Sequence, residues 1–60
     1  MDTANLTLLT IADLRRLDLD LRRKLNQVKP ATDPQTAREL LRERRAVRTE
    51  LTARLAALTN

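Results

Sequence analysis

The sequence predicts an all-α fold, an antiparallel two-helix hairpin with helices at about residues 11–29 and 34–58. The chain is rich in Leu, Ala, Arg and Glu and contains no Gly, a composition typical of helical hairpins and coiled coils. Large apolar residues recur at helical spacing in both segments, and each segment follows a helix-start signal. We therefore expect one helical domain over residues 11–58, preceded by an extended N-terminal arm over residues 1–10.

The first helix has a complete start signal. Thr10 is placed as the N-cap, Asp13 follows three residues later to close a capping box, and Leu9 can pack against Leu14 as a hydrophobic staple. The helix is therefore expected to begin at Ile11. Its apolar stripe, which covers about a third of the circumference at ~100° per residue, consists of Ile11, Leu14, Leu17, Leu21, Leu25 and Val28.

The turn is marked by two prolines. Pro30 disfavours helical geometry in the residue before it, so the first helix is expected to end near Lys29. Asp33 can cap a second helix that has Pro34 at its first position; Thr32 with Gln35 is an alternative cap one residue earlier. The apolar residues of the second helix are Ala37, Leu40, Leu41, Val47, Leu51, Leu55 and Leu58.

One charged residue interrupts each apolar stripe. If the turn centres near residues 31–32, residue i lies level with roughly residue 63 − i because both helices rise ~1.5 Å per residue. Asp18 and Arg44 then lie within a turn of each other. They are expected either to form a polar layer that sets register or partner choice, or to lie at the stripe edges with Asp18 paired to Arg15 or Arg22.

Charge is sorted by side. The formal net charge is +4, with twelve Lys and Arg against eight Asp and Glu. One side of the hairpin is expected to be basic, and these residues are candidate nucleic-acid contacts: Arg15, Arg22, Lys29, Arg38, Arg42 and Arg45. The opposite side collects Asp13, Asp20, Glu39, Glu43 and Glu50. A twofold copy could set its basic side against the acidic one, or both sides could be solvated faces.

A chain of 60 residues forms a small core that usually needs an additional source of stability. It has no Cys for disulfides and no His, and its carboxylates are not clustered as metal ligands, so we expect no bound metal. The remaining source of stability is association with a second copy or a partner helix, as a four-helix bundle or coiled coil. The expected protein interface consists of Leu14, Leu17, Leu21, Leu25, Leu40, Val47, Leu51 and Leu55.

Several functions are disfavoured by missing residue types. Without His, Cys, Ser or Tyr we expect no catalytic site, cofactor or small-molecule substrate, and without Gly no phosphate-binding loop. The absence of aromatic residues disfavours single-stranded nucleic acid more than a duplex backbone. No segment approaches the ~20 apolar residues of a membrane span, and the first ten residues lack the Lys or Arg of a secretory signal, so we expect a cytoplasmic protein.

In outline the chain resembles small basic two-helix proteins, such as the hairpin protein of the large ribosomal subunit near the peptide exit and the plasmid regulator Rop. The resemblance lies in architecture and carries no motif beyond a basic second helix around residues 44–49, so no functional residue is transferred. The leading expectation is a non-enzymatic interaction or oligomerisation module, a small adaptor, regulator or assembly subunit. The alternative is a small basic protein that binds nucleic-acid backbone, of a ribosomal, plasmid or phage-regulator type.

Overall fold

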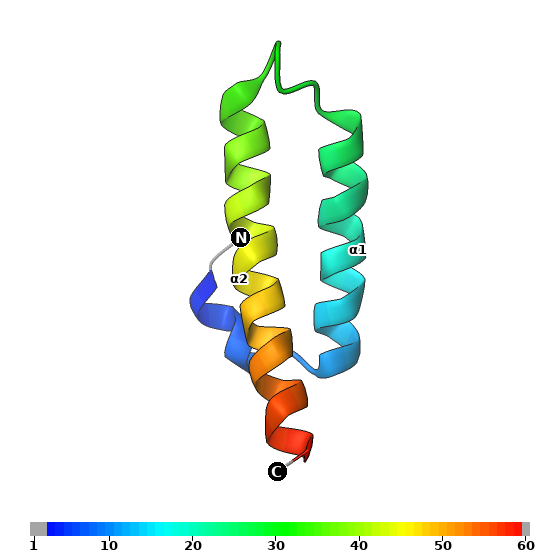
Figure 1. Cartoon of the computed structure of the whole chain (residues 1–60), viewed down its shortest axis with the longest axis vertical. Coiled ribbons are helices and arrows are strands. Elements are labelled where there is room, and N and C mark those ends of the chain that lie inside the picture. The colour runs from blue at the N-terminus through cyan, green and yellow to red at the C-terminus, as the bar shows by residue number, and fades with distance from the viewer. Residues whose placement is uncertain (1–2, 60) are drawn as a thin grey trace.

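The computed structural model describes residues 3–59 and contains a 3-10 helix η1 (Thr3–Leu8) and two α-helices, α1 (Ile11–Gln27) and α2 (Pro34–Thr59). The helices pack side by side along an elongated body of 44 × 19 × 15 Å, with the turn at one end and η1 against the other half of α2 (Figure 1). No strand occurs in residues 3–59. The predicted all-helical hairpin is therefore confirmed.

The start of α1 follows the local signal. Thr10 Oγ1 accepts a hydrogen bond from the Asp13 backbone N–H at 3.1 Å, and Asp13 Oδ2 accepts one from the Thr10 N–H at 3.3 Å. These two bonds satisfy backbone donors that a helix leaves unpaired in its first turn. Leu9 packs against the core cluster that contains Leu14, as a residue preceding the N-cap does in a hydrophobic staple.

The end of α1 lies two residues earlier than predicted, at Gln27 rather than Lys29. Val28 is the C-cap with extended backbone, φ −81° and ψ 134°, and its N–H still bonds to the Lys24 carbonyl. The Lys29 carbonyl accepts the N–H groups of Thr32 and Asp33, which closes the turn. The helix ends before Pro30, which has no N–H to donate to the Asn26 carbonyl and disfavours helical geometry at Lys29.

Asp33 is the N-cap of α2, since its Oδ1 accepts the Thr36 N–H at 3.2 Å. The alternative cap is not used, because the Thr32 hydroxyl donates to the Lys29 carbonyl at 3.2 Å. Pro34 occupies the first helical position, where its missing N–H leaves no bond unmade. α2 continues to Thr59, one residue beyond the predicted end.

The prediction of an extended N-terminal arm is wrong for residues 3–8, which form η1. Residues 1 and 2 of the predicted arm lie outside the described part. Leu6 is buried at 4% exposure beside α2, and the Leu9 N–H bonds to its carbonyl. Burying an apolar side chain in a short segment requires its backbone groups to be paired. A helical turn pairs some of them locally, which an extended arm alongside a helix does not.

The core is small and lies between α1, α2 and η1. Its buried cluster consists of Leu6, Leu14, Leu21 and Val47, with Leu9, Leu17, Leu40, Ala46 and Leu51 packed against it. Leu41, expected to meet the first helix, is instead 55% exposed, and Leu55 is 39% exposed. Leu19, which lies outside the apolar stripe of α1, is 52% exposed.

Candidate functional site

An open groove runs along the outer face of α2, and we call it the arginine groove. Arg45 lies two residues before buried Val47, about 200° around the helix, which turns its side chain away from α1. All the lining residues belong to α2: Arg38, Leu41, Arg42, Arg44, Arg45, Arg48, Thr49, Thr52 and Ala53. Five of these nine side chains are arginines and none is acidic, so the groove presents concentrated positive charge.

Asp18 lies at the edge of this array and links it to α1. Arg44 Nε donates to Asp18 Oδ1 at 3.1 Å, and Arg48 reaches Asp18 Oδ2 at 3.8 Å. The Asp18 side chain is 19% exposed, against 27% for Arg44 and 62% for Arg48. The structure therefore brings Asp18 and Arg44 together across the hairpin; within residues 3–59 Asp18 forms no ion pair with Arg15 or Arg22.

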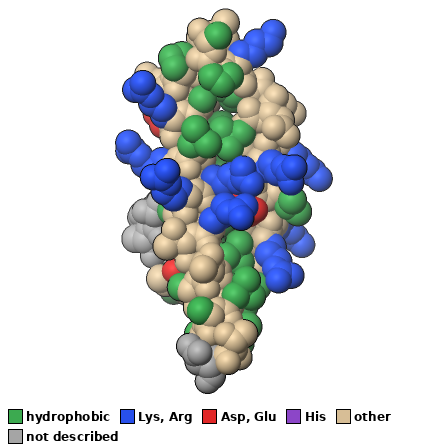
Figure 2. Space-filling model, in the orientation of Figure 1, with side chains coloured by type: hydrophobic (Ala, Val, Ile, Leu, Met, Phe, Trp, Pro, Cys, Tyr) green, Lys and Arg blue, Asp and Glu red, His purple; other side chains and the backbone are tan. Residues whose placement is uncertain are grey.

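The predicted basic side is divided by the structure. Arg38, Arg42 and Arg45 line the arginine groove, whereas Arg15, Arg22 and Lys29 are exposed on or just beyond α1 and do not line it. Basic side chains nevertheless gather over both helices on one face of the molecule, with little acidic surface among them (Figure 2). The sequence interpretation missed Arg48, which an i, i+4 relation to Arg44 on the helix surface could have revealed.

The predicted protein interface is largely used inside the hairpin. Leu14, Leu21 and Val47 are buried at 0%, 1% and 1% exposure, so they offer no surface to a partner in this conformation. Leu17, Leu25, Leu40 and Leu51 are partly buried. Leu55 is the member with most surface remaining. The two apolar stripes of the hairpin cover each other first, because they face each other within one chain.

The C-terminal end of α2 forms a second candidate surface, which we call the α2 overhang, residues 51–59. α2 has 26 residues and α1 has 17, and α2 projects past the start of α1 (Figure 1). Leu55 and Leu58 continue the stripe of Leu51 at the i+4 and i+7 positions. Because no helix lies opposite, they are 39% and 72% exposed.

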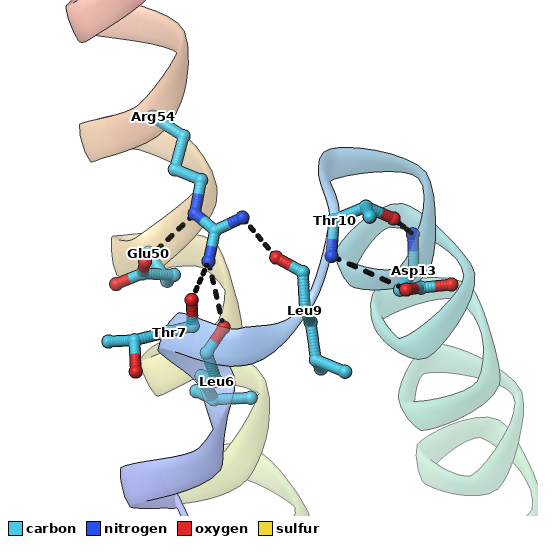
Figure 3. A network of polar contacts seen from close by, with 7 residues as sticks. All are labelled: Leu6, Thr7, Leu9, Thr10, Asp13, Glu50 and Arg54. Atoms are coloured by element: carbon cyan, nitrogen blue, oxygen red, sulfur yellow. Dashed lines mark hydrogen bonds and ion pairs between the residues drawn. The ribbon is translucent and has the colours of Figure 1, made fainter.

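Arg54 fastens η1 to α2. Its Nη2 donates to the carbonyl oxygens of Leu6 at 3.0 Å and Thr7 at 2.8 Å, and its Nη1 donates to the Leu9 carbonyl (Figure 3). Nε pairs with Glu50 Oε1 at 3.0 Å, which orients the guanidinium. No local pattern in the sequence indicates this role of Arg54, since the carbonyls that it binds come from a segment 45–48 residues away.

The position of η1 also changes the acidic side of the molecule. Leu6 and Thr7 line a shallow groove together with Arg42, Arg45 and Glu50. η1 therefore occupies part of the flank of α2 that carries Glu50. A twofold contact that pairs basic with acidic sides has less acidic surface available than the sequence suggested.

Within residues 3–59, no helix has an apolar run that could cross a bilayer, and no three acidic side chains lie close enough to hold a metal ion together. The fold and surface define a helical hairpin in which α2 carries an arginine-rich face. No known protein family, curated protein or solved structure matches the chain.

Proposed function

We propose that this chain is a non-enzymatic interaction module that associates with a second copy through the α2 overhang. The observation that carries the proposal is the exposure of Leu55 and Leu58, 39% and 72%, on a helix end that extends beyond α1. Leu55 and Leu58 continue the apolar stripe of α2 beyond α1, and an exposed apolar stripe is the surface by which amphipathic helices recognise one another. We place this module in the cytoplasm, which its lack of Cys permits.

A second copy fits this surface because the surface is self-complementary. In an isologous dimer each copy presents the same patch, so the Leu55–Leu58 stripe of one overhang covers that of the other. The two α2 helices would then extend the apolar core of each hairpin across the contact. The small number of fully buried residues in the monomer, among them Leu14, Leu21 and Val47, makes such added burial a substantial gain in stability.

The proposal moves the interface from the place that the sequence indicated. Leu14, Leu21 and Val47 would contact a partner only if the hairpin opened, and opening would expose the most deeply buried side chains. Leu55 and Leu58 need no such opening. The contact is therefore expected at the end of the molecule distant from the turn.

Sedimentation equilibrium of the full chain, detected by interference because the chain contains no Trp or Tyr, tests the proposal. The average mass should rise from monomer to dimer with concentration. Leu55→Asp should abolish the rise while the circular dichroism stays helical. Ala57→Asp is the matched control, since it places the same charge on the same turn at an exposed position about 200° around the helix.

The proposal fails if the wild-type chain remains a folded monomer at all concentrations. It also fails if Leu55→Asp and Ala57→Asp weaken association equally, because the effect would then come from charge near the helix end and not from the leucine stripe.

A further inference from the structure

The arginine groove carries positive charge that the molecule itself leaves largely uncompensated. Of its five arginines, Arg44 and Arg48 share one carboxylate, Asp18. Among the ion pairs of the described part of the chain, none involves Arg38, Arg42 or Arg45. Charge held along one helix without compensation repels itself, and an anionic partner relieves that repulsion.

We propose that the arginine groove binds the phosphate backbone of double-stranded nucleic acid. The arginines from Arg38 to Arg48 extend over about 15 Å of helix at ~1.5 Å per residue. A duplex strand presents a phosphate about every 3.4 Å along its axis, so several phosphates lie within reach. Thr49 and Thr52 in the same groove add hydroxyl donors, which also contact phosphate oxygens.

The shape of α2 suits a duplex. An α-helix with its side chains is about 10–12 Å across, and the major groove of B-DNA is about 12 Å wide. The groove is open to solvent between its two neighbours: Asp18 of α1 pairs with Arg44 and Arg48 along one edge, and Leu6 and Thr7 of η1 adjoin Arg42 and Arg45 along the other. Backbone contact by this face needs no rearrangement of the hairpin.

Two other anionic partners fit less well. An acidic protein would meet a surface whose centre is charged, with Leu41 as its one large exposed apolar side chain, whereas protein interfaces are depleted of charge at their centres. An anionic membrane would gain little apolar burial from Leu41 alone. Single-stranded nucleic acid would find no aromatic side chain on which to stack.

Asp18 limits the positive charge of this site. It holds the Arg44 guanidinium at 3.1 Å and offsets one unit of the groove's charge. Removing that charge while keeping the size of the side chain should raise the affinity for phosphate. Asp18→Asn is therefore expected to bind a duplex more tightly than the wild-type chain, a gain that a damaged fold does not produce.

The test is fluorescence anisotropy of labelled duplex DNA and duplex RNA, about 20 base pairs long, titrated with the full chain at several salt concentrations. The logarithm of the affinity should fall linearly with the logarithm of salt concentration, with a slope of about −0.9 per phosphate contact on DNA. The double variant Arg38→Gln/Arg45→Gln should bind about tenfold or more weakly, with a slope shallower by about 1 for each lost contact.

The matched control is Arg16→Gln/Arg23→Gln, which removes the same charge from exposed positions of α1 outside the groove. It should change the affinity by no more than about threefold through net charge alone. Equal losses in the two double variants would overturn the assignment of the site. No duplex binding at low salt would overturn the proposal, including the case in which the chain instead binds polyglutamate or anionic vesicles.

The inference is independent of the self-association proposed above. The two surfaces share Thr52 and Ala53, but Leu55 lies outside the lining of the groove and the substituted arginines lie outside the overhang, so each proposal can fail without the other.

Discussion

Arg44 of α2 donates from Nε to Oδ1 of Asp18 on α1 at 3.1 Å, across 26 residues of sequence. Both side chains interrupt apolar stripes, and the bond joins those stripes at one level of the hairpin. Whether this contact also sets register or partner choice stays a prediction. Its contribution to stability can be measured directly.

Asp18→Asn should lower the free energy of unfolding by about 1 kcal/mol, the usual value for a partly exposed, charge-assisted hydrogen bond. A double-mutant cycle with Arg44→Gln, followed by urea unfolding, should show a coupling of about 0.5–1 kcal/mol. Arg48→Gln should couple more weakly, because its distance to Asp18 is 3.8 Å and it is 62% exposed. Purely additive effects of Asp18→Asn and Arg44→Gln would show that the contact does not stabilise the fold.

Arg54→Met should release η1 from α2. The substitution removes the donors to the carbonyls of Leu6, Thr7 and Leu9 while keeping an apolar stem of similar length. Amide exchange at Leu9, whose N–H bonds to the Leu6 carbonyl, should become faster, and stability should fall by about 2 kcal/mol.

Arg54→Lys provides the matched comparison, because it keeps the charge but not the planar fork of donors. Its amide exchange rate at Leu9 and its stability should both lie between those of the wild-type chain and Arg54→Met. If Arg54→Lys behaved like wild type, charge alone would hold η1, and the geometry of the guanidinium would be unimportant.

Thr10→Ala should destabilise the chain by about 1 kcal/mol, since it removes the hydroxyl that accepts the Asp13 N–H at the start of α1. Urea unfolding followed by circular dichroism measures the change. Thr32→Ala is the control: its hydroxyl bonds only to the exposed turn, so the expected change is within about 0.5 kcal/mol. Similar losses in the two variants would contradict a specific capping role.

Leu21→Asp should abolish most of the helicity and the proposed association with it. Leu21 is 1% exposed in the core, and burying an unpaired carboxylate there costs more than a small domain can offset. Leu19→Asp, two residues earlier at 52% exposure, should leave the circular dichroism nearly unchanged. A helical Leu21→Asp would mean that the core between α1 and α2 is not formed as the structure shows.

The parts that could be predicted are those whose causes are local. The capping box at Thr10 and Asp13 and the cap at Asp33 each need partners within three residues, so the sequence contains all the information. The meeting of Asp18 and Arg44 is a longer inference, but equal helical rise on both sides of a short turn makes it a matter of counting.

The parts that could not be predicted depend on contacts between distant segments. Periodicity placed Leu41 with the apolar residues of the second helix. A single opposing helix covers only part of that apolar stripe, and Leu41 lies outside the covered part, at 55% exposure. The early end of α1 at Gln27 coincides with the extended backbone of Val28, which no local signal in the sequence marks.

The sequence by itself therefore determined two helices, their starts and their antiparallel pairing, because capping bonds and helical periodicity act over a few residues. Only the tertiary structure decided that residues 3–8 form a 3-10 helix, since its carbonyls are bonded by Arg54 from the far end of α2. It also decided which leucines are used inside the hairpin and which remain exposed on the overhang. Burial depends on the lengths of both helices and on what lies opposite each residue, and no single segment contains that information.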